Sequence, residues 1–92
     1  MRFTETVIPG VVVVDIEPIT DDRGAFARLH CPDEFAASGH PFVPAQTSLS
    51  RNPRAGTLRG LHHHPAPHAE VKLVRALRGR VFDVAVDLRP AS

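Results

Sequence analysis

The side chains best suited to acid–base chemistry gather in one stretch of the chain, residues 57–79. This stretch holds four of the six histidines and the only lysine, Lys72. An unperturbed imidazole titrates at roughly pH 6.5, so histidine is a natural choice for moving protons at neutral pH. Lys72 lies between apolar Val71 and Leu73. Its ammonium group therefore either reaches from a sheet to water or is held in a pocket.

The composition is that of one small domain, which we assign to residues 1–92. A domain of this length buries only about 60–65 % of its extended surface, so its core is marginal and a second subunit would help. The net charge is +1, with acids and bases dispersed along the chain. That distribution provides no basic stripe for nucleic acid or an anionic membrane. We therefore expect a small-molecule partner, no nucleic acid and no membrane.

The cellular compartment is predicted from cysteine use and from the N-terminal segment. Cys31 is the only cysteine, so no internal disulfide can form, and this suits a reducing compartment. The apolar run Val11–Val14 is far shorter than the ~18 residues of a spanning helix, and no small-residue cleavage site follows it. We expect neither a signal peptide nor an anchor, and a cytoplasmic protein.

The first half of the chain contains clear turn and helix signals. The Pro9–Gly10 pair predicts a turn, and the four valines after it predict a strand with both faces covered. Residues 19–26, ITDDRGAF, predict a turn with Arg23 at its tip. Residues 32–39, PDEFAASG, predict a short helix that begins at a proline and ends at a glycine.

The last part of the chain alternates between apolar and polar residues. Residues 81–88 place Phe82, Val84, Val86 and Leu88 on one face and Asp83, Ala85 and Asp87 on the other, so the first face is predicted to be core. Residues 72–77 alternate as well. The Arg78–Gly79 pair between the two segments predicts a tight turn, so we expect a hairpin.

Several short strands with little helix predict an all-β sandwich or barrel of the jelly-roll kind. Such folds usually need about eight strands to cover their edges. The sequence provides only five or six strand candidates. Either another chain completes the sheet, or the sequence is the first part of a longer domain.

Several motifs resemble those of the dTDP-4-dehydrorhamnose 3,5-epimerase family. They are Asp-Arg-Gly-Ala-Phe at 22–26, Gln-Thr-Ser-Leu-Ser at 46–50, Leu-Arg-Gly-Leu-His at 58–62, Lys-Leu-Val-Arg at 72–75, Arg-Gly at 78–79 and Asp-Val-Ala-Val-Asp-Leu-Arg at 83–89. The resemblance covers nearly the whole chain, but only about the first half of a typical member. It implies a cupin-type jelly roll (double-stranded β-helix) with one short helix, incomplete in this chain and lacking the family's C-terminal half. It also implies a homodimer that exchanges N-terminal strands.

The sequence departs from the family pattern at three points. Ser48 stands where members usually have asparagine, and Arg28 stands near a substrate-binding glutamate. The family's tyrosine proton donor and the aspartate partner of its catalytic histidine belong to the C-terminal half, and this sequence contains no tyrosine.

The resemblance implies a reaction and a set of site residues. The substrate is a dTDP-4-keto-6-deoxyhexose of dTDP-rhamnose-type biosynthesis, whose ketone acidifies the protons at C3 and C5, and no cofactor is needed. His62 is the predicted base and Lys72 the predicted cation that stabilises the enolate. The other predicted site residues are Arg23 and Arg59 on the diphosphate, Phe26, Gln46 and Ser48 in the pocket, and Asp83 as a possible support for the imidazole.

Alternatives stay open at the level of sequence. His62 could be a solvated loop residue, as we expect for His63, His64 and His68, and Lys72 could be an edge lysine in water. A metal-binding cupin would use His62, His64 and Glu70, whose spacing approximates the metal motif of that superfamily. A third possibility is a non-catalytic remnant that binds a nucleotide sugar. Metal content, hydrogen exchange and dTDP binding distinguish the three.

Overall fold

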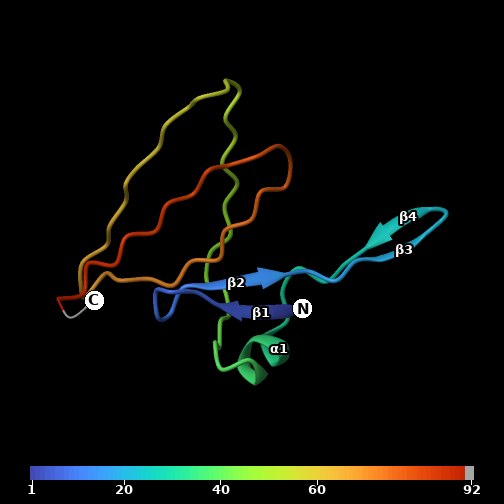
Figure 1. Cartoon of the computed structure of the whole chain (residues 1–92), viewed down its shortest axis with the longest axis horizontal. Coiled ribbons are helices and arrows are strands. Elements are labelled where there is room, and N and C mark those ends of the chain that lie inside the picture. The colour runs from blue at the N-terminus through green and yellow to red at the C-terminus, as the bar shows by residue number, and fades with distance from the viewer. Residues whose placement is uncertain (91–92) are drawn as a thin grey trace.

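The structure, a computed structural model, describes residues 1–90. Its regular elements in that range are four strands, in two separate two-stranded antiparallel sheets, and one short helix (Figure 1). They are β1 (Arg2–Glu5), β2 (Val12–Asp15), β3 (Ile19–Asp21), β4 (Gly24–Phe26) and α1 (Pro32–Ala37). The regular structure is thus strands plus one short helix, as expected for an all-β chain.

The first hairpin, β1–β2, forms because the chain contains a suitable turn. The backbone N–H of Val11 donates to the carbonyl of Ile8 over 3.0 Å, and Gly10 has φ +90°. Proline followed by a glycine with positive φ is the signature of a type II turn. This confirms the predicted turn and strand. The prediction that both faces of this strand are covered was wrong, because the Val13 side chain is 50 % exposed.

The second hairpin, β3–β4, projects away from the rest of the chain (Figure 1). Asp21 pairs with Gly24, so Asp22 and Arg23 form a two-residue turn with Arg23 at the tip, as predicted. The hairpin carries apolar side chains with little cover, since Ile19 is 74 % and Phe26 77 % exposed.

Helix α1 confirms the predicted helix at residues 32–39. The predicted range also included the two residues that cap its C-terminus, Ser38 and Gly39. Pro32 occupies the first turn and the helix proper ends at Ala37. Gly39 follows with φ +87°, and the N–H of His40 donates to the carbonyl of Phe35 over 3.1 Å. This is a Schellman motif, in which glycine adopts the left-handed conformation at no steric cost.

The core is one aromatic cluster around α1. Phe35 is 4 % exposed and is the buried hydrophobic residue of the described chain. Its ring lies 5.0 Å from that of Phe3 on β1, 4.7 Å from that of His30 and 5.9 Å from that of Phe42. The Nε2 of His30 also lies 2.6 Å from the carbonyl oxygen of Phe42. These contacts hold α1 against the first hairpin.

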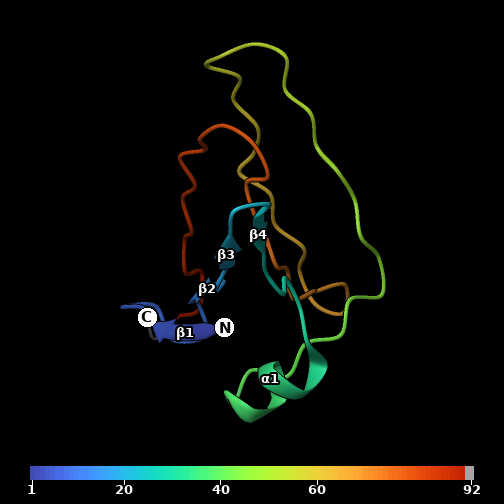
Figure 2. The same ribbon diagram turned by 90° about the vertical axis from the view of Figure 1, so that its right-hand side faces the viewer.

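Residues 43–90 run as long extended and bent segments without strand pairing (Figures 1 and 2). The predicted hairpin of residues 72–77 with 81–88 is therefore wrong, although the chain does bend at Leu77–Gly79. The face of 81–88 predicted as core is also exposed, with Phe82 at 94 %. Two strands alone are marginal in water, and they need a further sheet or helix to cover their apolar face.

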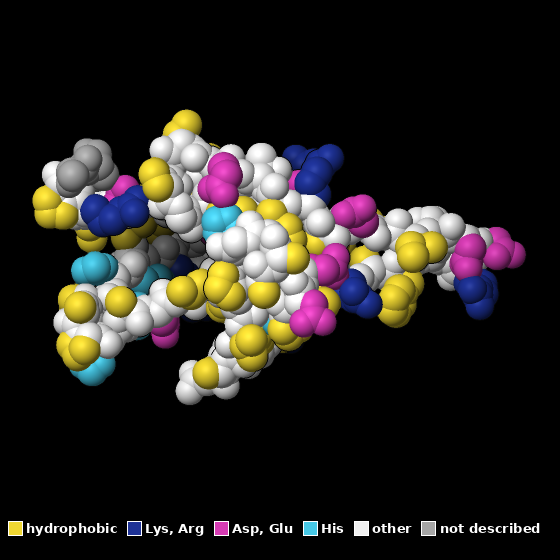
Figure 3. Space-filling model, turned by 90° about the horizontal axis from the view of Figure 1, so that it is seen from below, with side chains coloured by type: hydrophobic (Ala, Val, Ile, Leu, Met, Phe, Trp, Pro, Cys, Tyr) yellow, Lys and Arg dark blue, Asp and Glu magenta, His cyan; other side chains and the backbone are white. Residues whose placement is uncertain are grey.

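The molecule has an open shape, and many of its apolar side chains are exposed. Figure 3 shows hydrophobic side chains on several parts of the surface seen from below. The radius of gyration is 15.4 Å, whereas a compact chain of this length has about 12 Å. The apolar faces of the long segments thus lack a covering layer within the described residues.

Candidate functional site

The predicted base, His62, lies directly against Gly60. A Cβ atom built on Gly60 would lie 3.2 Å from His62 Nδ1 and 3.3 Å from its backbone nitrogen, and Gly60 has φ +96°. Both the backbone conformation and the space favour glycine here. The imidazole therefore occupies a place that a larger residue at position 60 would crowd.

The predicted cation, Lys72, forms an ion pair with Glu70. Their Nζ and Oε1 atoms lie 3.3 Å apart, and both side chains are about half exposed, at 49 % and 52 %. The same Glu70 oxygen lies 3.5 Å from His64 Nε2. Glu70 thus joins the ammonium to a histidine, though not to His62.

This cluster bears on the metal alternative. Of its three predicted ligands, the structure brings together His64 and Glu70. Within residues 1–90 there is no group of three or more histidine, cysteine, aspartate or glutamate side chains arranged to hold a metal ion.

The two predicted diphosphate ligands are exposed, and each has a partner. Arg59 Nε donates to Asn52 Oδ1 over 2.5 Å. Arg23 pairs with Asp21, with Nε 3.1 Å from Oδ2, and its side chain is 86 % exposed. The Arg23 guanidinium, by its side-chain hydrogen bonds, lowers the pKa of the Asp21 carboxyl. Both arginines are charged and open to solvent.

The remaining predicted residues come from three different segments of the chain. Gln46 and Ser48 are exposed on one extended segment, and Asp83 is exposed on another. Phe26 is on β4 and lines a hollow. None of the other predicted site residues lines that hollow.

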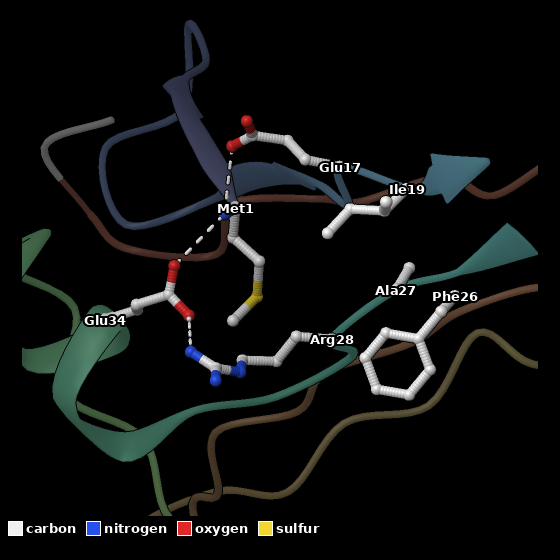
Figure 4. Close-up of a pocket in the computed structure, with 7 residues that line it drawn as sticks. All are labelled: Met1, Glu17, Ile19, Phe26, Ala27, Arg28 and Glu34. Atoms are coloured by element: carbon white, nitrogen blue, oxygen red, sulfur yellow. Dashed lines mark hydrogen bonds and ion pairs between the residues drawn. The ribbon is translucent and has the colours of Figure 1, made fainter. Parts of the chain in front are cut away.

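The hollow that Phe26 lines has a volume of about 170 Å³ (Figure 4). Its other lining residues are Met1, Glu17, Ile19, Ala27, Arg28 and Glu34. The Met1 ammonium lies 2.9 Å from Glu17 Oε1 and 3.2 Å from Glu34 Oε1, while Arg28 Nη1 lies 3.0 Å from Glu34 Oε2. Arg28 first, and then the Met1 ammonium, lower the pKa of Glu34.

Two of these features were missed by sequence reasoning. Arg28 was recognised only as a departure from the family pattern, and its partner Glu34 was assigned to a helix turn. Asn52 was not singled out. A signal existed for Arg28 alone, since opposite charges six residues apart on either side of Pro32 can meet when the helix starts. Nothing in the spacing of Asn52 and Arg59 indicates their hydrogen bond.

No helix in residues 1–90 combines the length and apolar character of a membrane span. A comparison with solved structures finds no significant match.

The proteins to which the chain is similar are sugar-nucleotide epimerases. A dTDP-4-dehydrorhamnose 3,5-epimerase of Pseudomonas aeruginosa is 45 % identical over 93 residues, which cover 100 % of this chain and 50 % of the relative. A dTDP-4-dehydrorhamnose 3-epimerase of Streptomyces niveus is 42 % identical, with 100 % and 44 % covered. The 3,5-epimerase of Escherichia coli K12 is 39 % identical, with 100 % and 50 % covered.

The family itself follows from a match to a family model. The family model described as dTDP-4-dehydrorhamnose 3,5-epimerase matches residues 5–92. The chain therefore belongs to the dTDP-4-dehydrorhamnose 3,5-epimerase family. It spans about half the length of the curated relatives it matches.

Proposed function

We propose that this chain acts in the cofactor-independent epimerisation of a dTDP-4-keto-6-deoxyhexose at C3, C5 or both, an isomerase reaction of deoxysugar biosynthesis in the cytoplasm. The observation that carries the proposal is the family match over residues 5–92. Within that range the blocks at 58–62 and 72–75 supply a histidine and a lysine. These are the two groups that the chemistry needs most.

The proposed chemistry is a proton transfer in two steps. His62 removes the proton at C3 or C5, and the electron pair moves to the C4 oxygen to give an enolate. A fixed cation near that oxygen stabilises the transition state more than the ground state, and Lys72 takes this role. The enolate then receives a proton on the opposite face, which inverts the carbon. None of these 92 residues is a tyrosine, so water or a group outside them returns the proton.

The geometry of the described residues supports parts of this assignment. His62 has a defined place against Gly60, and Lys72 has a carboxylate partner in Glu70. Arg23 and Arg59 each present an exposed guanidinium, which suits bidentate contact with phosphate oxygens. Phe26, Gln46 and Ser48 would line the pocket, and Asp83 would support the imidazole.

The proposed fold is a cupin-type jelly roll that further strands complete. The support is the exposed apolar face at 81–88 and the relatives' greater length. We also propose a homodimer in which the projecting β3–β4 hairpin reaches the neighbouring subunit, since Ile19 and Phe26 on it are uncovered. Light scattering after size exclusion should give twice the chain mass, and a monomer at every concentration would contradict the dimer.

The function is tested by hydrogen exchange rather than by turnover. The protein is incubated with the dTDP-4-keto-6-deoxyhexose in D₂O, and deuterium at C3 and C5 is measured by NMR. Wild type should exchange and His62→Ala should not, while His63→Ala, next to the base, should keep the activity. Absence of exchange in the wild type, with dTDP still bound, would instead favour the non-catalytic remnant.

A metal-binding function is the second candidate, favoured by the approach of His64 to Glu70. Elemental analysis of protein purified without added ions should show stoichiometric iron, manganese or zinc if it is right. The epimerase proposal predicts exchange at C3 or C5 that a chelator leaves unchanged.

A further inference from the structure

The turn at residues 52–59 holds the guanidinium of Arg59 in a particular way. Asn52 Oδ1 accepts a hydrogen bond from Arg59 Nε over 2.5 Å. A guanidinium carries five N–H donors, and this contact uses the one on Nε. One of the four donors on the two terminal nitrogens lies on the same edge of the guanidinium as Nε–H, and the two at its far end, one on each terminal nitrogen, point away from Asn52. Those donors make the parallel pair that matches two phosphate oxygens.

The residues around Asn52 hold its side chain in this position. Thr57 Oγ1 donates to the carbonyl of Arg54 over 2.7 Å, and Gly56 has φ +79°, so the turn closes on itself. Pro53 fixes one more backbone angle and keeps Asn52 extended. Asn52 Nδ2 lies 3.4 Å from Ser50 Oγ, which orients the amide so that its oxygen faces Arg59.

We propose that Asn52 is a positioning residue for diphosphate binding, which it serves by holding the Arg59 guanidinium with its terminal nitrogens free. This inference rests on the proposed function, because Arg59 is a phosphate ligand only within it. An arginine side chain in water samples many rotamers, and ordering it on binding is unfavourable. A partner that orders it beforehand tightens binding without touching the ligand. Ser50, in the motif at 46–50, supports Asn52 from the other side.

The first measurement concerns the hydrogen bond alone. The Nε–H signal of Arg59, assigned by its loss in Arg59→Lys, is followed by NMR. Its exchange with water should be slower in the wild type than in Asn52→Ala, by about fivefold or more. Equal exchange rates would show that Asn52 does not hold the guanidinium, and would overturn the inference whatever the protein's function.

The second measurement is a double-mutant cycle with dTDP as the probe. Asn52→Ala should weaken dTDP binding about three- to tenfold, which corresponds to the net contribution of one typical hydrogen bond. In an Arg59→Ala background the same change should have no further effect, because additivity fails for residues that act together. Thymidine, which lacks the phosphates, should bind wild type and Asn52→Ala equally.

The outcomes separate this inference from the proposed function. If dTDP binds and Asn52→Ala weakens it equally with and without Arg59, Asn52 acts in some other way and the inference is overturned. If wild type binds no dTDP although the Nε–H is protected, the proposed function fails and the role in diphosphate binding fails with it.

Discussion

The imidazole of His62 lies over Gly60, so that a single added carbon at position 60 would approach Nδ1 to 3.2 Å. In the proposed reaction this nitrogen belongs to the base. A side chain added at position 60 would therefore displace the imidazole of His62 while leaving the imidazole itself chemically unchanged.

Gly60→Ala should lower deuterium exchange at C3 and C5 by about tenfold or more, since small displacements of a reacting group have large effects on rate. The matched control is Gly79→Ala. Gly79 also has positive φ, +82°, but its Cβ would meet nothing within 4 Å. Backbone strain is then similar in both variants, and only Gly60→Ala displaces the ring. If deuterium exchange falls by a similar factor in the two variants, the effect is due to backbone strain and not to displacement of the ring.

Lys72→Met should lower the exchange rate about 10²–10³-fold, the range for removing one group that stabilises an oxyanion. Binding of dTDP should change little, because the ammonium acts on the sugar ketone. Arg80→Met removes one positive charge elsewhere and is the control for net charge. A Lys72→Met variant that loses dTDP affinity but keeps its maximal exchange rate would place the ammonium on the nucleotide instead.

Phe35→Ala should destabilise the fold by about 3 kcal/mol, a typical value for removing a buried aromatic ring. In a small core this is enough to release α1 from the first hairpin, and loss of helical circular dichroism at lower urea concentration measures it. Phe82→Ala is the control, since Phe82 is 94 % exposed and such changes alter stability by about 0.5 kcal/mol or less. Equal destabilisation by both would show that the 81–88 face is covered in solution.

Asp87 should titrate at low pH. Its oxygens accept hydrogen bonds from Arg89, with Nη2 2.8 Å from Oδ2 and Nε 2.9 Å from Oδ1, and these lower the pKa of Asp87 from 3.8 to about 2. Because the folded-state pKa is depressed, the stabilisation is present above pH 3.8 and is lost as the pH falls through about 2. NMR titration of the carboxyl checks this.

Arg89→Gln should move the titration of Asp87 back toward 3.8. It should also loosen the segment around Arg89 from the first hairpin, since Arg89 Nη2 donates to the carbonyl of Pro9 over 2.8 Å. An Asp87 midpoint near 3.8 in the wild type would show that the pair does not form in solution.

What the sequence determined by itself is local. The turns at Pro9–Gly10 and Asp22–Arg23 and the helix end at Gly39 were all predictable, because each depends on hydrogen bonds or a positive φ within a few residues. The family was predictable for a related reason, since its motifs are short and contiguous.

What only the tertiary structure decided is which distant groups meet. Alternation at 81–88 predicted a buried face, yet a strand face is buried only if another layer covers it, and the described residues supply none. The aromatic cluster on Phe35, the contact of Arg28 with Glu34 and that of Asn52 with Arg59 likewise depend on how the chain returns on itself. Spacing along the sequence does not specify such returns, because they are fixed by the packing of whole elements.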